Sequence, residues 1–193
     1  FNDRNYPNFT KLLTQNNIAS QPTPMSFSVS CETTGLEYNG TTLNGLFAQR
    51  INLLRTSFYK MVFNIYRFNK DAKFFLNKNN EFDLSFSEFL ERGKYGNDVR
   101  DFYIYPMASA IWSEGPDKIS DAPFYFFAKF FENHGMLNIN DRPQWRVIQG
   151  GSQEYVKKLT ASFRNRIRLK CPVKKIRRDK NNVKIESSDK EET

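Results

Sequence analysis

The 193-residue sequence is poor in the residues that build metal centres and disulfide frameworks. It has one histidine, His134, and two cysteines, Cys31 and Cys171, that lie far apart in the chain. Two distant thiols make neither a disulfide framework nor a metal site, so we expect reduced cysteines and a cytoplasmic protein. A single imidazole also excludes a site that is built on several histidines.

Other familiar signals are missing as well. No run approaches the roughly 18 apolar residues that span a bilayer, and no signal peptide is visible. The sequence opens at Phe1 without an initiator methionine, so we expect a fragment or a processed chain. A hydrolytic triad would depend on His134 alone, and no nucleophile-elbow motif accompanies it. His134 is therefore either a hydrogen-bonding loop residue or a catalytic one.

Positive charge is in excess. The net charge is +8 and the pI is about 9.5, which raises nucleic acid or an anionic membrane surface as a partner. Eleven of the 29 basic residues lie at 157–180, where they alternate with apolar residues, as in the run RIRLK at 166–170. This pattern is typical of the solvated face of a strand, and no recognised nucleic-acid motif accompanies it. Both interpretations stay open.

Aromatic residues are also abundant, with 19 phenylalanines and 9 tyrosines. Together with a hydrophobic fraction of 39%, they indicate a folded, aromatic-rich protein. Large planar side chains fill cores and also wall apolar ligand cavities, so both uses are considered.

Strand and helix patterns alternate in the first half of the chain. Residues 9–13 have the spacing of a short helix, and 26–31 alternate apolar residues with serines, as a half-buried strand does. Residues 36–38 return as a second strand, which predicts an antiparallel hairpin. Further on, apolar residues recur in steps of four and three and predict one continuous helix. They are Phe47, Ile51, Leu54, Phe58, Met61, Ile65 and Phe68.

That stripe favours a core-facing helix, but the basic residues around it would also suit a membrane-surface helix. They are Arg50, Arg55, Lys60 and Arg67. Ser85 and Glu88 form a capping-box pattern that predicts a short helix. Residues 98–112 predict a helix that is kinked, or ended and restarted, at Pro106. We expect a loop at 113–123 and a helix buried on most sides at 124–131.

Residues 142–159 predict a strand, a glycine turn and a helix. Val147 and Ile148 favour the strand, the pair Gly150–Gly151 favours the turn, and Ser152 is the expected helix cap. A helix that opens after glycines can hold an anionic ligand, yet many such turns bind nothing. Beyond it we expect three strands, at 167–169, 173–176 and 183–185, and then a charged tail.

Six motifs, in order, resemble the predicted NAD/FAD-binding, flavin amine oxidase-like oxidoreductases of bacteria. They are FNDRNYPNF, PMSFSVS, LFAQRINLLR, YPMASAIWS, FFENHGML and RPQWRVIQGGSQEYVKKL. The resemblance covers nearly the whole chain. It implies an α+β fold with a substrate-binding domain at 1–143, built from a mixed or antiparallel sheet and flanking helices. Residues 144–186 would be a strand-helix-strand-strand piece that returns to an FAD-binding α/β domain, and 187–193 a tail.

The resemblance also implies an FAD cofactor and a set of site residues. A first group would pass the flavin ring: Asn2, Arg4 and Tyr6. A second group would form the strand and turn that re-enter the cofactor domain: Trp145, Arg146, Gly150 and Gly151. The backbone of Val173 would contact the adenine, and Trp112 and His134 would lie toward the substrate pocket. No metal is implied, and the catalytic residues stay unassigned.

One departure from that family is large. A dinucleotide fold needs a G-x-G-x-x-G turn to hold the pyrophosphate, and the sequence has none. We therefore expect the chain to be an internal portion of an FAD-dependent oxidoreductase whose substrate is small and apolar. This portion would need the rest of its own FAD domain as a partner and would be inactive alone. The alternative is a non-catalytic module whose basic C-terminal strands bind nucleic acid or anionic lipid.

Overall fold

The computed structural model describes residues 1–78, 82–138, 140–187 and 191–192. The chain forms two compact units, one of residues 1–11 and 20–147 and the other of residues 12–19 and 148–193. The boundary passes through helix α1 (Pro7–Gln15) and strand β4 (Trp145–Ile148). These are units of packing, and the division into substrate domain, cofactor domain and tail stays a prediction.

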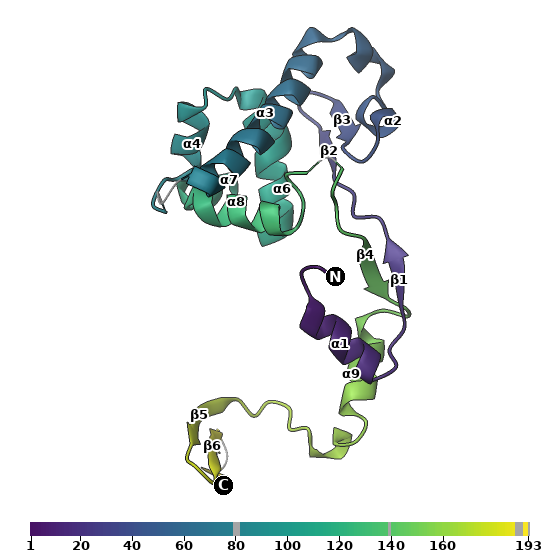
Figure 1. Cartoon of the computed structure of the whole chain (residues 1–193), viewed down its shortest axis with the longest axis vertical. Helices are drawn as coiled ribbons and strands as arrows, with labels where there is room; N and C mark the ends of the chain where they lie inside the picture. The colour runs from purple at the N-terminus through teal and green to yellow at the C-terminus, as the bar shows by residue number, and fades with distance from the viewer. Residues whose placement is uncertain (79–81, 139, 188–190, 193) are drawn as a thin grey trace. The chain divides into compact units, whose positions relative to one another are not determined.

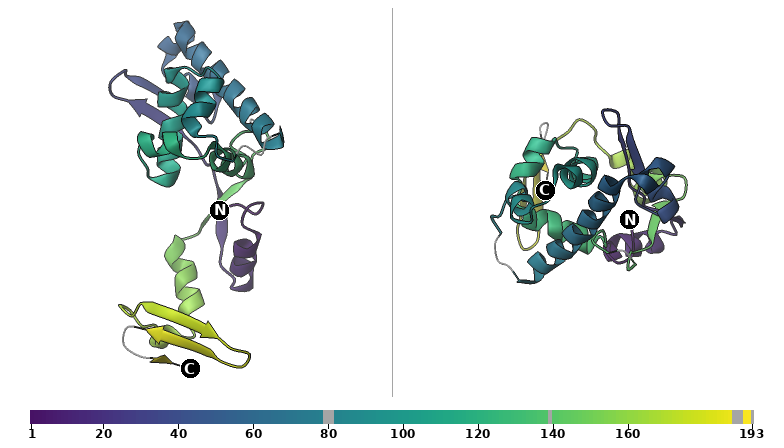
Figure 2. Two further views of the ribbon diagram at one scale, coloured as in Figure 1. Left: turned by 90° about the vertical axis from the view of Figure 1, so that its left-hand side faces the viewer. Right: turned by 90° about the horizontal axis from the view of Figure 1, so that it is seen from above.

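The larger unit is mainly helical. Figure 1 shows α3, α4, α6, α7 and α8 gathered into one group, which the two views of Figure 2 also show. The helices in chain order are α2 (Leu43–Leu46), η1 (Arg50–Leu54), α3 (Thr56–Lys78), α4 (Phe86–Arg92), α5 (Asn97–Val99), η2 (Arg100–Ile104), α6 (Tyr105–Trp112), α7 (Pro116–Asp121) and α8 (Phe124–Asn133). Of these, η1 is a 3₁₀ helix and η2 is a π-helix.

Aromatic rings fill the core of this unit. Phe68 is fully buried, and its ring centroid lies 5.6–6.2 Å from those of five other rings. Most of these pairs meet edge to face, the arrangement that the ring quadrupole favours. The five partners are Phe86, Phe89, Tyr95, Phe124 and Phe127. Abundant phenylalanine therefore serves the core of this unit.

The prediction of one continuous helix over 47–68 was wrong in its first half. The α-helix starts only at Thr56, and the 3₁₀ helix η1 precedes it. Ile51 and Leu54, which were expected in the core, are 53% and 82% exposed. Asn52 is the residue of η1 that is buried instead, because its side-chain amide donates a hydrogen bond to the side-chain oxygen of Gln49. From Phe58 onward, the predicted stripe does face the core.

One prediction farther along also needs correction. Residues 113–123, expected as a loop, contain α7, which begins with Pro116 at a position where proline is favourable. Helix α8 is buried on most sides, as predicted, and Phe126 lies on its exposed side. The capping box is also confirmed: Ser85 accepts from the Glu88 N–H, and Glu88 accepts from the Ser85 N–H.

The change of helix predicted at Pro106 is confirmed within one residue, because the π-helix η2 ends at Ile104 and α6 begins at Tyr105. The chain runs from α5 through the π-helix η2 into α6, with Pro106 in the first turn of α6. Proline cannot donate to the carbonyl four residues before it, which belongs to Phe102. The Tyr38 hydroxyl donates to that carbonyl at 2.7 Å. A side chain of the β2–β3 hairpin thus satisfies an acceptor that the proline leaves free.

The strands of the larger unit form two small sheets. The predicted hairpin is confirmed: β2 (Ser28–Cys31) pairs antiparallel with β3 (Leu36–Asn39), with Val29 opposite Tyr38. Strand β1 (Ser20–Thr23) pairs with β4, so a segment near the start of the chain meets the segment that ends this unit.

The smaller unit contains α9 (Ser152–Thr160), η3 (Arg164–Arg166) and a three-stranded antiparallel sheet. Its strands are β5 (Val173–Arg178), β6 (Val183–Ser187) and β7 (Glu191–Glu192). The two later strands of the prediction are confirmed. The strand at 167–169 was wrong, because 166–170 form η3 and irregular chain with every side chain exposed. Within the expected tail, 191–192 pair with β6, while 188–190 and 193 lie outside the described residues. Helices and small antiparallel sheets together confirm the α+β class.

Candidate functional site

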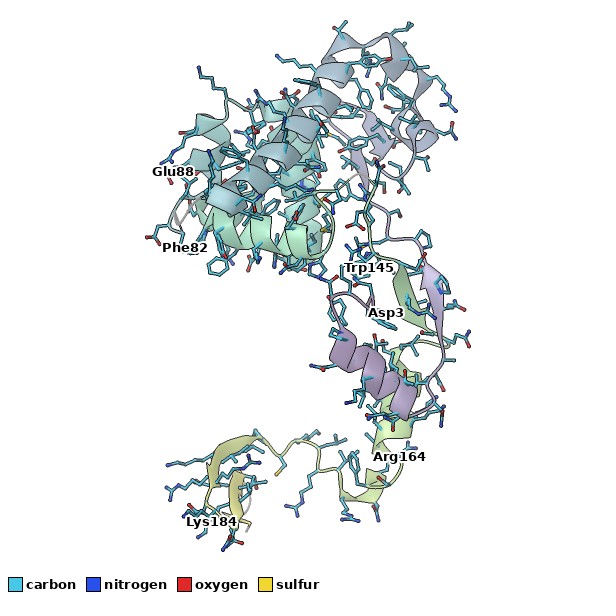
Figure 3. The ribbon with its side chains drawn as sticks, viewed as in Figure 1. Asp3, Phe82, Glu88, Trp145, Arg164 and Lys184 are labelled. Atoms are coloured by element: carbon cyan, nitrogen blue, oxygen red, sulfur yellow. The ribbon has the colours of Figure 1, made fainter. Side chains whose placement is uncertain are left out.

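Two segments that lie far apart in the sequence meet within the larger unit. The terminal ammonium of Phe1 donates to the Arg146 carbonyl at 3.1 Å, and the Arg146 N–H donates to the Phe1 carbonyl at 2.8 Å. Figure 3 labels Asp3 and Trp145, one residue from each segment. This pairing places residues 1–6 against 132–146, the two regions in which most of the predicted site residues lie.

An ion pair reinforces the meeting of the two segments. The Arg4 guanidinium donates to both carboxylate oxygens of Asp141, at 2.9 and 3.2 Å. These hydrogen bonds, and then the positive charge, hold the pKa of Asp141 below its ordinary value. Nearby, the Asn5 side-chain amide donates to the Asn133 carbonyl at 2.5 Å. Both links are formed by side chains of the N-terminal segment.

His134 lies between a carbonyl and a phenol. Its Nδ1 is 2.8 Å from the Phe130 carbonyl, and its Nε2 is 3.2 Å from the Tyr6 hydroxyl. A carbonyl can only accept, so Nδ1 carries the proton in this bond. In the neutral imidazole, Nε2 is then the acceptor, and the Tyr6 O–H donates to it. The geometry thus fixes the tautomer and leaves one basic nitrogen facing a hydroxyl.

His134 also belongs to a row of four rings in which each ring stacks on, or is tilted against, the next. The Trp112 and Phe130 centroids are 5.1 Å apart, Phe130 stacks on His134 at 4.0 Å, and His134 faces Trp145 at 6.1 Å with an interplanar angle of 17°. We call Trp112, Phe130, His134 and Trp145 the aromatic row. Trp112 is exposed and the other three are half-buried. The row therefore offers a partly open apolar wall.

Unpartnered polar atoms accompany the N-terminal segment. Among the described residues, four buried side-chain atoms have no hydrogen-bond partner: Asn2 Nδ2, Asn5 Oδ1, Glu132 Oε2 and Arg67 Nε. Two of them belong to the segment 1–6, and the third to Glu132, which precedes the Asn133 that Asn5 contacts. A buried polar group without a partner is costly, so each calls for a physical explanation.

The larger unit thus holds seven of the predicted site residues in two connected segments and one row. They are Asn2, Arg4, Tyr6, Trp112, His134, Trp145 and Arg146. Arg146 also binds Ser20 of β1 through Nε at 3.0 Å and Nη2 at 3.1 Å. Sequence reasoning missed Asn5, Phe130 and Asp141. Nothing in their spacing marks them. Asn5 and Asp141 each bond to a partner more than a hundred positions away, and the ring of Phe130 belongs to a helix that was assigned to the core.

The other three predicted residues belong to the smaller unit. Gly150 and Gly151 adopt φ values of +79° and +89°, which confirms the glycine turn. The expected cap was wrong, because Gly151 is the N-cap residue of α9 and Ser152 is its first residue. Val173 is the exposed first residue of β5.

A cavity of about 180 Å³ lies elsewhere in the larger unit. Its lining includes Asn52, Arg55, Phe58, Met61 and Asp98, none of which was a predicted site residue. Within the described ranges, no three His, Cys, Asp or Glu side chains are placed to hold a metal ion. The same residues contain no helix that is both long and apolar enough to cross a bilayer.

The whole sequence corresponds to one known family. The family model described as flavin containing amine oxidoreductase matches residues 1–193. The match includes the first segment, the aromatic row and the smaller unit. No curated protein matches the chain.

Proposed function

The chain belongs to the flavin-containing amine oxidoreductase family, and from that premise we propose that it forms part of the flavin and substrate site of an FAD-dependent oxidoreductase. The substrate would be small and apolar and would lose a hydride from a C–H bond, either beside an amine nitrogen or in a hydrocarbon chain. A bound flavin supplies the acceptor for those two electrons. The observation that carries this proposal is the convergence of residues 1–6 with the aromatic row.

The polar atoms of the N-terminal segment fit the flavin ring. The pyrimidine edge of that ring alternates carbonyl acceptors with an N–H donor. Asn2 Nδ2 is a donor and Asn5 Oδ1 an acceptor, and both are buried without a partner. They would hold the ring edge, and the half-buried face of Trp145 would support a flat ring by stacking. The sequence contains no comparable binding site for the pyrophosphate of FAD, because it has no G-x-G-x-x-G turn.

The residues of this chain would position the substrate and transfer one proton. The aromatic row excludes water from one side of an apolar substrate. His134 Nε2 can receive the Tyr6 phenolic proton while the Tyr6 oxygen receives one from a donor on its exposed side, such as a substrate ammonium. The bond from Nδ1 to the Phe130 carbonyl keeps the imidazole in the tautomer that this transfer needs.

Titration with two flavins tests the proposal. If the chain holds the ring but not the pyrophosphate, then FAD and lumiflavin, which is the ring alone, should bind with similar and weaker than micromolar affinity. Binding should quench tryptophan fluorescence, and the Trp145→Ala variant should lose most of the affinity. Phe126→Ala is the matched control, because Phe126 lies on α8 but is exposed.

Two results would contradict this assignment. Micromolar or tighter binding of FAD together with weak lumiflavin binding would mean that the chain does hold the pyrophosphate. Absence of lumiflavin binding at its solubility limit would mean that the aromatic row and the N-terminal segment do not form a ring site.

A second candidate function rests on strand β5. All six of its side chains are exposed, and four of them are Lys174, Lys175, Arg177 and Arg178. A non-catalytic module of this kind would bind nucleic acid or anionic lipid with an affinity that falls steeply as salt is added. Changing these four residues together to glutamine should abolish that binding. Binding that does not depend on salt would remove this candidate.

A further inference from the structure

The 3₁₀ helix η1 reverses the usual distribution of polar and apolar side chains. Asn52 is the buried residue of η1, with no exposed surface, while the aliphatic residues Ile51, Leu53 and Leu54 are 53%, 47% and 82% exposed. Aliphatic side chains in water and an amide in the interior are the opposite of what folding favours. Such local conflicts concentrate at functional surfaces.

Hydrogen bonds hold this arrangement in place. The Asn52 N–H donates to the Gln49 carbonyl at 2.9 Å. The Gln49 side chain in turn donates to the Gly35 carbonyl at 2.7 Å and accepts from the Glu37 N–H at 3.0 Å. The exposed aliphatic residues therefore sit on a segment that is tied to the β2–β3 hairpin. A 3₁₀ helix also repeats every three residues, so Ile51 and Leu54 share one face.

Basic residues predominate in the sequence around η1. Residues 38–70 contain five basic residues and no aspartate or glutamate. Figure 1 shows α2 and the start of α3 at one end of the larger unit, and η1 joins these two helices in the sequence. Leu43 of α2 and Phe63 of α3 are exposed as well. Two carboxylates also lie near, Asp98, which lines the same cavity as Arg55, and Glu37, whose N–H donates to Gln49. The basic residues are Arg50, Arg55, Lys60, Arg67 and Lys70.

We propose that η1 docks on a bilayer surface that contains anionic phospholipid. Ile51, Leu53 and Leu54 enter the boundary between headgroups and acyl chains, and Arg50, Arg55 and Lys60 meet the lipid phosphates. Apolar side chains flanked by basic ones bind an interface without spanning it, and each basic residue near an anionic surface adds to the attraction. This inference does not depend on flavin binding.

Sedimentation of the full chain with vesicles tests the proposal. We expect binding to vesicles of phosphatidylcholine mixed with phosphatidylglycerol, and much weaker binding to phosphatidylcholine alone. The Leu53→Ser/Leu54→Ser variant should bind about tenfold less tightly or worse, because two leucines no longer leave water. Arg55→Gln/Lys60→Gln should lower the affinity for the mixed vesicles only. Phe126→Ser is the matched control, since it removes a similarly exposed apolar residue from α8.

Three outcomes would overturn the proposal. They are failure of the unchanged chain to bind mixed vesicles, undiminished binding by the double leucine variant, and equal loss in the Phe126→Ser control. Circular dichroism and sedimentation velocity on each variant separate these outcomes from misfolding. If the leucine substitutions abolish a dimer and leave vesicle binding intact, the surface contacts another copy of the chain and the lipid proposal fails.

Discussion

The aromatic core of the larger unit and the C-terminal sheet of the smaller one use apolar residues in opposite ways. Phe68 is completely buried among five rings, whereas Ile176 and Ile185, which are paired across β5 and β6, are both exposed. The core is therefore held by burial of apolar surface, and the sheet by backbone hydrogen bonds and cross-strand contacts. A small sheet without a buried face is marginal alone. Equal substitutions should thus have very unequal effects in the two regions.

The largest effect is expected from Phe68→Ala. Removing a fully buried ring from a packed core lowers the free energy of unfolding by about 3–5 kcal/mol. Phe63→Ala changes the same residue type on the same helix, α3, but Phe63 is 64% exposed, so the expected change is within about 0.5 kcal/mol. Ile176→Ala in the sheet should resemble the Phe63 variant. Chemical denaturation followed by circular dichroism measures all three.

This comparison would break if the two phenylalanine variants were equally stable. It would also break if Ile176→Ala cost as much as Phe68→Ala, because the sheet would then possess a buried face that its exposure does not show.

The sequence predicted the regular parts of both regions where a local signal was complete. Ser85 and Glu88 carry their capping chemistry within four residues, so the start of α4 could be predicted. The apolar stripe failed at Ile51 and Leu54 because periodicity counts apolar residues and cannot see that Gln49 bonds to the distant hairpin. Alternation failed at 167–169 for a related reason, since that segment has no strand to pair with among the described residues.

The candidate site shows the same limit more strongly. Tyr6 and His134 are 128 positions apart, and no spacing rule joins them. The resemblance to a known family indicated Tyr6, His134 and Trp145, but the ring of Phe130 that connects His134 to Trp112 became visible only in the fold. Contacts of this kind depend on the tertiary packing of α8 against the chain start, which composition and periodicity do not encode.

The next prediction compares one glycine from each unit. Gly151 and Gly115 are the N-cap residues of α9 and α7, and an added Cβ would meet nothing within 4 Å at either position. Only the backbone differs: Gly151 has φ +89° and ψ 173°, a region that is almost exclusive to glycine, and Gly115 has φ −74°. Gly151→Ala should therefore destabilise α9 by about 1–3 kcal/mol. Gly115→Ala should be close to neutral.

Hydrogen exchange of the α9 and α7 amides separates the two variants. Faster exchange in α9 for Gly151→Ala, with α7 unchanged in Gly115→Ala, is the expected pattern. Similar protection in both variants would mean that the turn relaxes to a conformation that alanine accepts, and that the smaller unit tolerates a side chain at a backbone conformation that disfavours one.

The smallest effect is expected from removing the ion pair between Arg4 and Asp141 in the larger unit. The pKa of Asp141 is lowered mainly by hydrogen bonds from Arg4, so the stabilisation is complete above the pKa of the unfolded chain and is lost as the pH falls through the lower, folded pKa. Because both side chains are exposed, the gain should be small and should shrink as salt is added. The pKa of Glu88 is also lowered, mainly by the hydrogen bond from the Ser85 N–H, so this group too contributes to the loss of stability in acid. The contribution of the pair is therefore the difference between the unchanged chain and Arg4→Gln, measured by denaturation from neutral to acidic pH. A difference that persists below the folded pKa would show that Arg4 acts by packing and not by charge.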